Sequence, residues 1–349
     1  MGIHDEIFEQ PACLAQLLEK QRVQVEKIAR VIRRQRIQYV FLAARGTSDN
    51  AGRYANYLWG AHNRIPIALA TPSLFTYYQQ PPRLHGALVL GISQSGKSPD
   101  IVSVLEEGKR QGCLTMAITN DTDSPLAGAA DLVLDIQAGT ETAVAATKTY
   151  TCELLSVAML SAALQESETG WNELHAVPDW AKQVLSLEDP IAGMAQRYRY
   201  MHRCVVLGRG FNYATAFEWS LKLKELSYVA AEPYSSADFL HGPIALVETG
   251  FPVMAVAPQG KVFSSMLEVL VQVRREQGAE LVVISDSDLA LELAQSPIRL
   301  PTGIPEWLTP PISIIPAQLF AYHLTRVKGY DPESPRVIHK VTETHSGMG

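Results

Sequence analysis

Cysteine is scarce in this sequence, and an excess of basic residues is missing. The four cysteines, Cys13, Cys113, Cys152 and Cys204, lie far apart in 349 residues and form no C-x-x-C pair. This spacing argues against a disulfide framework and against a cysteine zinc site. The net charge of −6 and the pI of about 5.9 argue against a nucleic-acid partner, because dedicated nucleic-acid binders usually carry a strong basic patch.

Long hydrophobic runs are also missing. The most apolar tract, residues 312–324, contains Pro316, Gln318 and His323 and is too short to span a membrane. No signal peptide precedes the first predicted helix, and Glu6 stands where a myristoylation signal requires Ser or Thr. We therefore expect a cytoplasmic protein without a membrane partner.

What the sequence does contain is an internal repeat. Gly46, at the end of FLAARG, corresponds to Gly210, at the end of CVVLGRG. Lys97 in LVLGISQSGK corresponds to Lys261 in PVMAVAPQGK, with the same separation along the chain. A third pair, GKRQGCLTMAITNDT and RREQGAELVVISDSD, aligns at nearly that separation. Three segments in register indicate a duplication, and the length of the chain also favours two domains.

Each copy alternates predicted strands with predicted helices. In the first copy, apolar strands are expected at residues 38–46, 65–70, 86–93, 114–120 and 131–136, with helices at 46–60, 98–112 and 141–165. This order predicts an α/β fold of two parallel sheets, each with helices on both faces. Helical spacing also covers residues 14–36, whereas residues 165–180 are polar and are expected to be irregular.

The predicted division of the chain has four parts. They are an N-terminal helical arm (1–30), a first unit (31–190), a second unit (191–330) and a C-terminal tail (331–349).

Residues 91–98, GISQSGKS, match the phosphate-loop pattern of nucleotide hydrolases. Pro99 follows directly, however, and proline lacks the N–H that this position normally donates to the nucleotide. Three hydroxyls, Ser93, Ser95 and Ser98, at a predicted helix N-terminus suit a single phosphate monoester, although ordinary capping also explains them. The second copy has APQGKV here, without a serine, so we expect one phosphate site per chain. A nucleotide hydrolase stays the alternative.

Five motifs in order resemble the sugar isomerase (SIS) domain family, most closely the isomerase half of the glutamine-dependent glucosamine-6-phosphate synthases. They are ARGTSDNAGRYAN, ISQSGKSPD, GTETAVAATKTYT, LGRGFNYATAFEWSLKLKELSYVAAEPYSSADFLHGPIAL and YDPESPRVIHKVTET. The resemblance covers nearly the whole chain and implies two flavodoxin-like units. It also implies a homodimer that binds a hexose-phosphate or aminosugar-phosphate substrate, with a tail over the active site and without cofactor or metal.

The resemblance carries individual residues with it. It assigns substrate and phosphate binding to Thr47, Ser48, Ser93, Gln94, Ser95, Ser98, Val144 and Lys222, and catalysis to Glu225, His241 and Lys340. Ala146 replaces a serine of the family motif, so one polar substrate contact is expected to be lost or supplied elsewhere. Lys97, Ser98 and Pro99 also depart from the family's commoner continuation, although Ser98 keeps the hydroxyl.

The chemistry implied for the three catalytic residues is distinct. Glu225 would move a proton between adjacent carbons, His241 would open the sugar ring, and Lys340 would form a Schiff base with the open-chain ketose. From spacing alone, Glu218, Lys222 and Glu225 fall on one helix face and equally suit a solvated ion pair. His241 before Gly-Pro equally suits a turn. In the family this histidine comes from the neighbouring subunit.

The expected reaction depends on the absence of a glutaminase domain from these residues. No glutaminase domain with a cysteine nucleophile is found in these residues, since Gly2 follows Met1. We therefore expect a deaminase that converts glucosamine 6-phosphate and water to fructose 6-phosphate and ammonia. The alternatives are a deglycase acting on a fructosamine-type sugar-amine 6-phosphate, an isomerising aminotransferase without its glutaminase, and a non-catalytic sugar-phosphate sensor.

Overall fold

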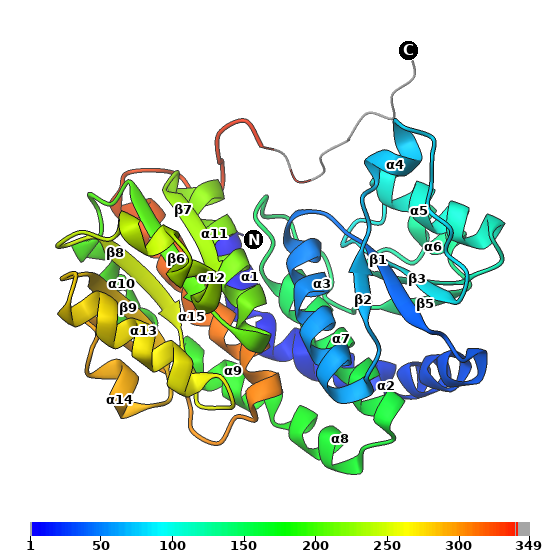
Figure 1. Cartoon of the computed structure of the whole chain (residues 1–349), viewed down its shortest axis with the longest axis horizontal. Helices are drawn as coiled ribbons and strands as arrows, with labels where there is room; N and C mark the ends of the chain where they lie inside the picture. The colour runs from blue at the N-terminus through cyan, green and yellow to red at the C-terminus, as the bar shows by residue number, and fades with distance from the viewer. Residues whose placement is uncertain (1, 339, 341–349) are drawn as a thin grey trace. The chain divides into compact units, whose positions relative to one another are not determined.

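The computed structural model describes residues 2–338 and residue 340. The chain forms two compact units (Figure 1). The β1–β5 unit comprises residues 12–141 and 148–176 together with Lys340. The β6–β10 unit comprises residues 2–11, 142–147 and 177–338. The predicted boundaries after residues 30, 190 and 330 stay predictions.

The β1–β5 unit is built on a parallel sheet. Its strands, in the order β2-β1-β3-β4-β5, are β1 (Tyr39–Ala43), β2 (Ile67–Leu69), β3 (Ala87–Ile92), β4 (Leu114–Thr119) and β5 (Leu132–Asp135). The helices are α2 (Gln10–Gln35), α3 (Gly46–Leu58), η1 (Trp59–Asn63), α4 (Ser73–Thr76), α5 (Pro99–Arg110), α6 (Pro125–Ala129), α7 (Lys148–Gln165) and α8 (Glu168–His175). Val89 and Ala117 pack against Val104 and Leu105 of α5, because alternate strand residues face opposite sides of a sheet.

The β6–β10 unit repeats this plan. Its strands, in the order β10-β9-β8-β6-β7, are β6 (Arg203–Gly208), β7 (Ala230–Ser235), β8 (Pro252–Val256), β9 (Glu280–Ser285) and β10 (Ser296–Arg299). Its helices are α1 (Ile3–Phe8), α9 (Val177–Leu185), α10 (Glu188–Arg197), η2 (Gly210–Asn212), α11 (Tyr213–Ser227), α12 (Ser236–Leu240), η3 (Pro243–Leu246), α13 (Phe263–Arg275), α14 (Asp288–Leu291), η4 (Glu306–Leu308) and α15 (Thr309–Val327). Val253 and Leu281 pack against Met266 and Leu270 of α13.

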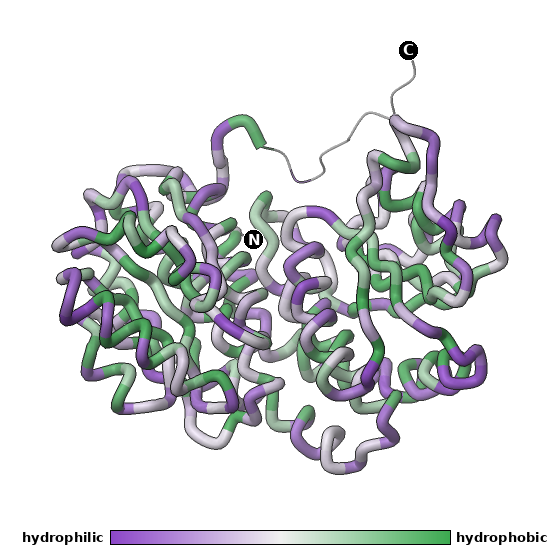
Figure 2. The backbone as a smooth tube through the Cα atoms, viewed as in Figure 1, coloured by the Kyte–Doolittle hydropathy of each residue, from purple (hydrophilic) through white to green (hydrophobic). Residues whose placement is uncertain are grey.

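The two sheets confirm the predicted fold class. Read in chain order, both have the flavodoxin-like order in which the second strand lies at one edge and the first lies beside it. The same sequence of strands and helices therefore occurs twice, as the repeat predicts. Hydrophobic residues concentrate on the strands and the inner helices of each unit, and hydrophilic residues on the loops (Figure 2).

The expectation of irregular structure at residues 165–180 is wrong. Helix α8 begins after Ser167, whose hydroxyl accepts from the N–H of Gly170 at 2.9 Å, and α9 follows it directly. Trp171 and Leu174 of α8 are buried, as is Val184 of α9. These apolar residues recur at helical spacing, but the many polar residues between them conceal the pattern.

No helix in the described part of the chain is long and apolar enough to cross a membrane.

Candidate active site

The hydroxyl-rich loop, residues 93–98, connects β3 to α5. The Oγ of Ser93 accepts from the N–H of Gly96 at 3.1 Å, and the Oγ of Ser95 accepts from the N–H of Lys97 at 3.4 Å. Gly96 has a φ of +62°, which favours glycine, and a Cβ there would lie 2.1 Å from the Oγ of Ser124. This position therefore requires glycine, and the loop is a tight turn that ends at the N-terminus of α5.

Ser98 occupies the N-cap position of α5, with Pro99 as the first helical residue. Its side chain makes no capping hydrogen bond, so the capping interpretation is wrong for this serine. Helix N-termini attract anions because their first N–H groups lack partners and the helix dipole is positive there. The hydroxyl of Ser98 thus lies at a helix end that attracts anions, and it does not act as a helix cap.

The loop after β1 and the hydroxyl-rich loop both lie at the C-terminal end of the parallel strands. Strands β1 and β3 are parallel neighbours, with Ala43 opposite Gly91. Thr47, in the first turn of α3 after β1, therefore lies at the same end of the strands as Ser93, which follows β3. Strand order reverses between these two strands, which is where open α/β sheets bind ligands. The hydroxyl of Ser48 donates to Oε1 of the buried Glu153 at 2.8 Å, which orients that serine.

Sequence reasoning missed the charged pair of Arg45 and Asp100 at this end of the strands. Arg45 follows β1, and its Nη2 and Nε lie 2.6 and 2.7 Å from Oδ2 of Asp100. The Asp100 side chain is buried, whereas that of Arg45 is half exposed. Asp100 therefore holds the guanidinium of Arg45 at the end of the sheet that carries the hydroxyl-rich loop. An arginine two residues after a strand that ends at the switch point was the signal for it.

Lys340 also lies in the β1–β5 unit, where it meets a buried carboxylate. Its Nζ lies 2.6 Å from Oε2 of Glu141. Glu141 in turn accepts from the N–H and the hydroxyl of Thr149, at 3.2 and 2.7 Å, in the first turn of α7. Glu141 is a second residue that sequence reasoning missed, although it stands in the motif GTETAVAATK. Of the predicted tail, residues 339 and 341–349 lie outside the described residues.

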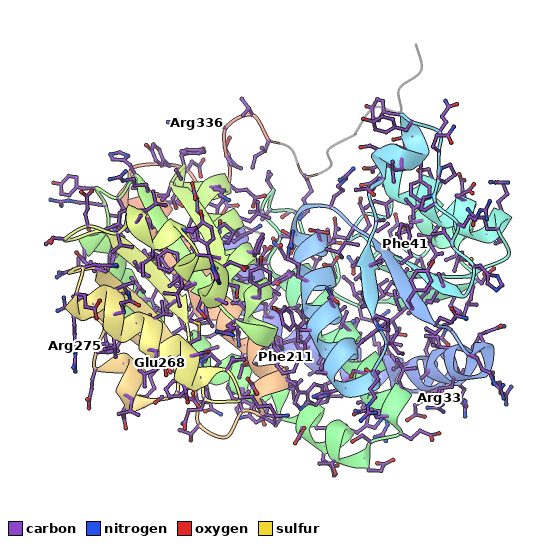
Figure 3. All side chains as sticks on the ribbon, in the orientation of Figure 1. Arg33, Phe41, Phe211, Glu268, Arg275 and Arg336 are labelled. Carbon is purple, nitrogen blue, oxygen red and sulfur yellow. The ribbon has the colours of Figure 1, made fainter. Side chains whose placement is uncertain are left out.

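The segment before residue 339 is anchored on the helix that carries Glu225. The side chain of Arg336, labelled in Figure 3, lies over two tyrosine rings. Its Cζ lies 4.4 Å from the ring centre of Tyr228 and 5.0 Å from that of Tyr330. Its backbone N–H donates to the hydroxyl of Tyr228 at 2.8 Å. Because Tyr228 directly follows α11, these contacts hold the segment at the end of that helix.

Helix α11 carries a buried charged triad. The Nζ of Lys222 lies 3.2 Å from Oε1 of Glu218 and 2.6 Å from Oε2 of Glu225. The Lys222 and Glu218 side chains are 0% exposed and that of Glu225 is 25% exposed, so the solvated surface pair is wrong. Burial alone would lower the pKa of Lys222, but the charges of Glu218 and Glu225 outweigh burial and raise that pKa above its ordinary value.

The remaining predicted residues of the β6–β10 unit are His241 and Val144. His241 is exposed at the C-terminal end of α12, where its backbone N–H donates to the carbonyl of Asp238 at 3.1 Å. Val144 is half-buried in the segment 142–147. The structure thus groups Lys222 with Glu225 in one unit. In the other, Thr47 and Ser48 follow β1 at the end of the strands where the hydroxyl-rich loop follows the neighbouring β3.

A polar cavity of about 410 Å³ lies in the β1–β5 unit. It is lined by Gln16, Gln94, Asn120, Asp135, Gln137, Gly139, Thr140 and Glu141. Uncharged amides and carboxylates line it, so it suits a hydrogen-bonding ligand better than an apolar one. Among the residues that the structure describes, no group of three or more histidine, cysteine or acidic side chains is arranged to hold a metal ion.

The fold and these loops define a duplicated α/β protein with a hydroxyl-rich loop at a sheet switch point. The SIS domain family matches residues 34–163 and again residues 198–328. Because the two matches cover most of the chain, the protein belongs to the SIS domain family.

The relatives share this architecture over nearly the whole chain. Glutamine–fructose-6-phosphate aminotransferase (isomerizing) of Bacteroides thetaiotaomicron is 33% identical over 354 residues, which cover 96% of this chain and 57% of that protein. The chain thus spans little more than half of such relatives. A candidate phosphosugar isomerase from Silicibacter pomeroyi is 34% identical with a TM-score of 0.82, covering 94% of this chain and 98% of that one. The C-terminal domain of glucosamine-fructose-6-phosphate aminotransferase from Francisella tularensis is 27% identical with a TM-score of 0.83, covering 95% and 97%.

Proposed function

We propose that this chain is a phosphosugar isomerase that acts as a deaminase, converting glucosamine 6-phosphate and water to fructose 6-phosphate and ammonia. Membership of the SIS family and the isomerase-type names of its relatives support the phosphosugar substrate. The hydroxyl-rich loop at the N-terminus of α5 supports binding of its phosphate.

The observation that carries the proposal is the triad on α11. Lys222 and Glu218 are fully buried, and the carboxylate of Glu225 is the one acidic group of the triad that reaches solvent. A carboxylate held at one place by a buried cation suits the transfer of a proton between adjacent carbons. In the open-chain sugar, Glu225 takes the proton from C2 and returns it to C1, while a second proton passes from the C2 amine to the C1 oxygen. The C1 aldehyde thereby becomes an alcohol and the C2 amine becomes an imine.

The other steps fall to His241 and Lys340. His241 gives a proton to the ring oxygen as the ring opens. The neutral amine of Lys340 attacks the C2 imine and displaces ammonia, and water then hydrolyses the resulting Schiff base to the ketose and free lysine. Glu141, at 2.6 Å from Nζ, is placed to take the proton that Lys340 must lose before it attacks.

The proposed direction follows from the second substrate. The chemistry is reversible, and the chain assayed by itself meets water as solvent and ammonia only at low concentration. Mass action therefore favours release of the amine.

One observation favours a second candidate, a deglycase for a sugar-amine 6-phosphate such as fructoselysine 6-phosphate. The cavity of about 410 Å³ is bordered by Glu141, the partner of Lys340, and by Gln94 of the hydroxyl-rich loop. It is far larger than ammonia requires, and its polar lining suits an amino-acid leaving group.

The deciding experiment measures ammonia and fructose 6-phosphate in parallel after addition of glucosamine 6-phosphate to the purified chain. Equal amounts of both products are expected. Turnover of fructoselysine 6-phosphate without release of ammonia from glucosamine 6-phosphate would move the assignment to the deglycase. Absence of turnover with either substrate, while both still raise the melting temperature, would contradict an enzymatic function and favour a sensor.

A further inference from the structure

The short helix α1 holds one end of the segment 142–147. Glu6 of α1 is 0% exposed. Its Oε1 accepts from the N–H and the hydroxyl of Thr142, the latter at 3.0 Å, and both carboxylate oxygens lie 3.2 Å from the N–H of Ala143. Three donors from two consecutive residues therefore converge on one carboxylate.

The other end of the segment is held from the start of α2. The Nε2 of Gln10 donates to Oε1 of Gln318 at 2.9 Å, and the Nε2 of Gln318 donates to the carbonyl of Thr147 at 3.4 Å. Gln10 and Gln318 are also buried. Between these two fixed ends lie Val144 and Ala146, whose side chains are half-buried.

The segment depends on these contacts because of its place in the chain. Residues 142–147 pack with the β6–β10 unit, whereas the chain up to Glu141 and from Lys148 onward belongs to the β1–β5 unit. This six-residue segment contains no helix or strand of its own. Its backbone position is therefore set by the groups that bind it, and one of these groups is the carboxylate of Glu6.

We propose that Glu6 is a positioning residue of the active site, whose carboxylate fixes the backbone of residues 142–147 and so the substrate-facing position of Val144. This inference rests on the proposed function and on the family resemblance, which assigns Val144 to substrate binding. A carboxylate suits the task because it only accepts hydrogen bonds. A glutamine would present one acceptor oxygen and one NH₂ group to donors that already converge there.

The test is Glu6→Gln, with Glu19→Gln as the matched control because Glu19 is an exposed glutamate on α2. Hydrogen exchange of a peptide covering residues 142–147 should accelerate in Glu6→Gln and not in the control. The KM for glucosamine 6-phosphate should rise about tenfold, since small displacements of a positioning group have effects of this size or larger, while kcat changes less than about twofold. Loss of folded protein alone would lower kcat and leave KM unchanged.

A milder variant guards against failure to fold. Thr142→Ala removes one donor to Glu6 and should give a smaller change of KM in the same direction. Unaltered exchange, or an unaltered KM, in Glu6→Gln would overturn the inference. If the wild type does not turn over glucosamine 6-phosphate, the proposed function has failed. The dissociation constant of fructose 6-phosphate then replaces KM, and the same comparison still decides on Glu6.

Discussion

The carboxylate of Glu225 lies at the solvent end of a charged group that is otherwise buried. Two acidic residues share one lysine in this triad, and Lys222 keeps its proton because their charges outweigh the effect of burial. The lysine thus holds one oxygen of Glu225 in place, at 2.6 Å, while the carboxylate keeps access to solvent. A proton-transfer base needs both properties.

The variant Glu225→Gln tests this base directly. An amide has the shape of the carboxylate but does not accept a proton from carbon, so kcat should fall at least about a hundredfold. Fructose 6-phosphate should still raise the melting temperature. Glu248→Gln is the control, because Glu248 is an exposed glutamate of the same unit paired with Arg203. Unchanged turnover in Glu225→Gln would remove Glu225 from the mechanism.

At the scale of elements, α1 connects parts of the β6–β10 unit that are far apart in the sequence. Its first N–H group, from Ile3, donates to both oxygens of Glu333 at 3.0 and 3.1 Å. His4 contacts Glu188 at the start of α10 at 2.6 Å, and His323 of α15 lies 3.3 Å from the same oxygen. A helix of six residues is thus held by the side chains of Glu333 and Glu188 rather than by its own propensity.

His323 makes this arrangement sensitive to acid. Burial lowers the pKa of His323, and the nearby Glu188 only partly opposes that effect, while His4 and Arg326 add to it. Because the folded state binds this proton less readily than the unfolded state, the contribution of His323 to stability is present above pH 6.5 and declines as the pH falls below that value. Thermal melting at pH 7.5 and 5.5 should show a larger loss in the wild type than in His323→Gln. An equal loss in both proteins would contradict this assignment.

At the scale of the whole molecule, the duplication holds in topology but not in chemistry. The loop of the second copy that corresponds to the hydroxyl-rich loop contains Gly260 and Lys261. The N–H of Lys261 donates to Oε2 of Glu306 at 3.0 Å, and a Cβ on Gly260 would lie 2.2 Å from the Glu306 side chain. A carboxylate of the protein itself therefore stands where the first copy is proposed to bind phosphate.

This difference predicts one sugar phosphate per chain. Titration calorimetry with fructose 6-phosphate should give a stoichiometry of about one. The variant Ser98→Ala should weaken binding about tenfold, a typical effect of losing one hydrogen bond to a charged ligand. A stoichiometry of two, or an affinity unchanged in Ser98→Ala, would show that the hydroxyl-rich loop is not the single phosphate site.

The implied homodimer is tested by mixing two inactive variants. If His241 completes the active site of the neighbouring subunit, the Glu225→Gln and His241→Gln variants should each be inactive alone. Random heterodimers would contain one site with both groups intact, so co-expression should restore about a quarter of the wild-type activity. Size-exclusion chromatography with light scattering measures the assembly. A dimer without any restored activity would place both residues in the same subunit's site.

Much of this molecule follows from local sequence pattern. Strands such as residues 86–93 are short, continuous apolar runs, and Pro99 marks a helix start, because both signals act within a few residues. The repeat, in which Gly46 and Lys97 correspond in register to Gly210 and Lys261, then determines the two equal folds. The hydroxyls of the loop at residues 93–98 could be found for the same reason, since loop and helix start are contiguous.

The partners of the site residues were decided only by the tertiary structure. Glu6 lies 136 residues before Thr142, Glu141 lies 199 residues before Lys340, and Glu153 lies 105 residues after Ser48. No local pattern marks a carboxylate as buried, because its burial depends on which distant donors meet it. The sequence by itself determined the sheets, the duplication and the hydroxyl-rich loop, whose signals are local. The packing of remote segments determined which acidic side chains bind the predicted site residues and the segments that carry them.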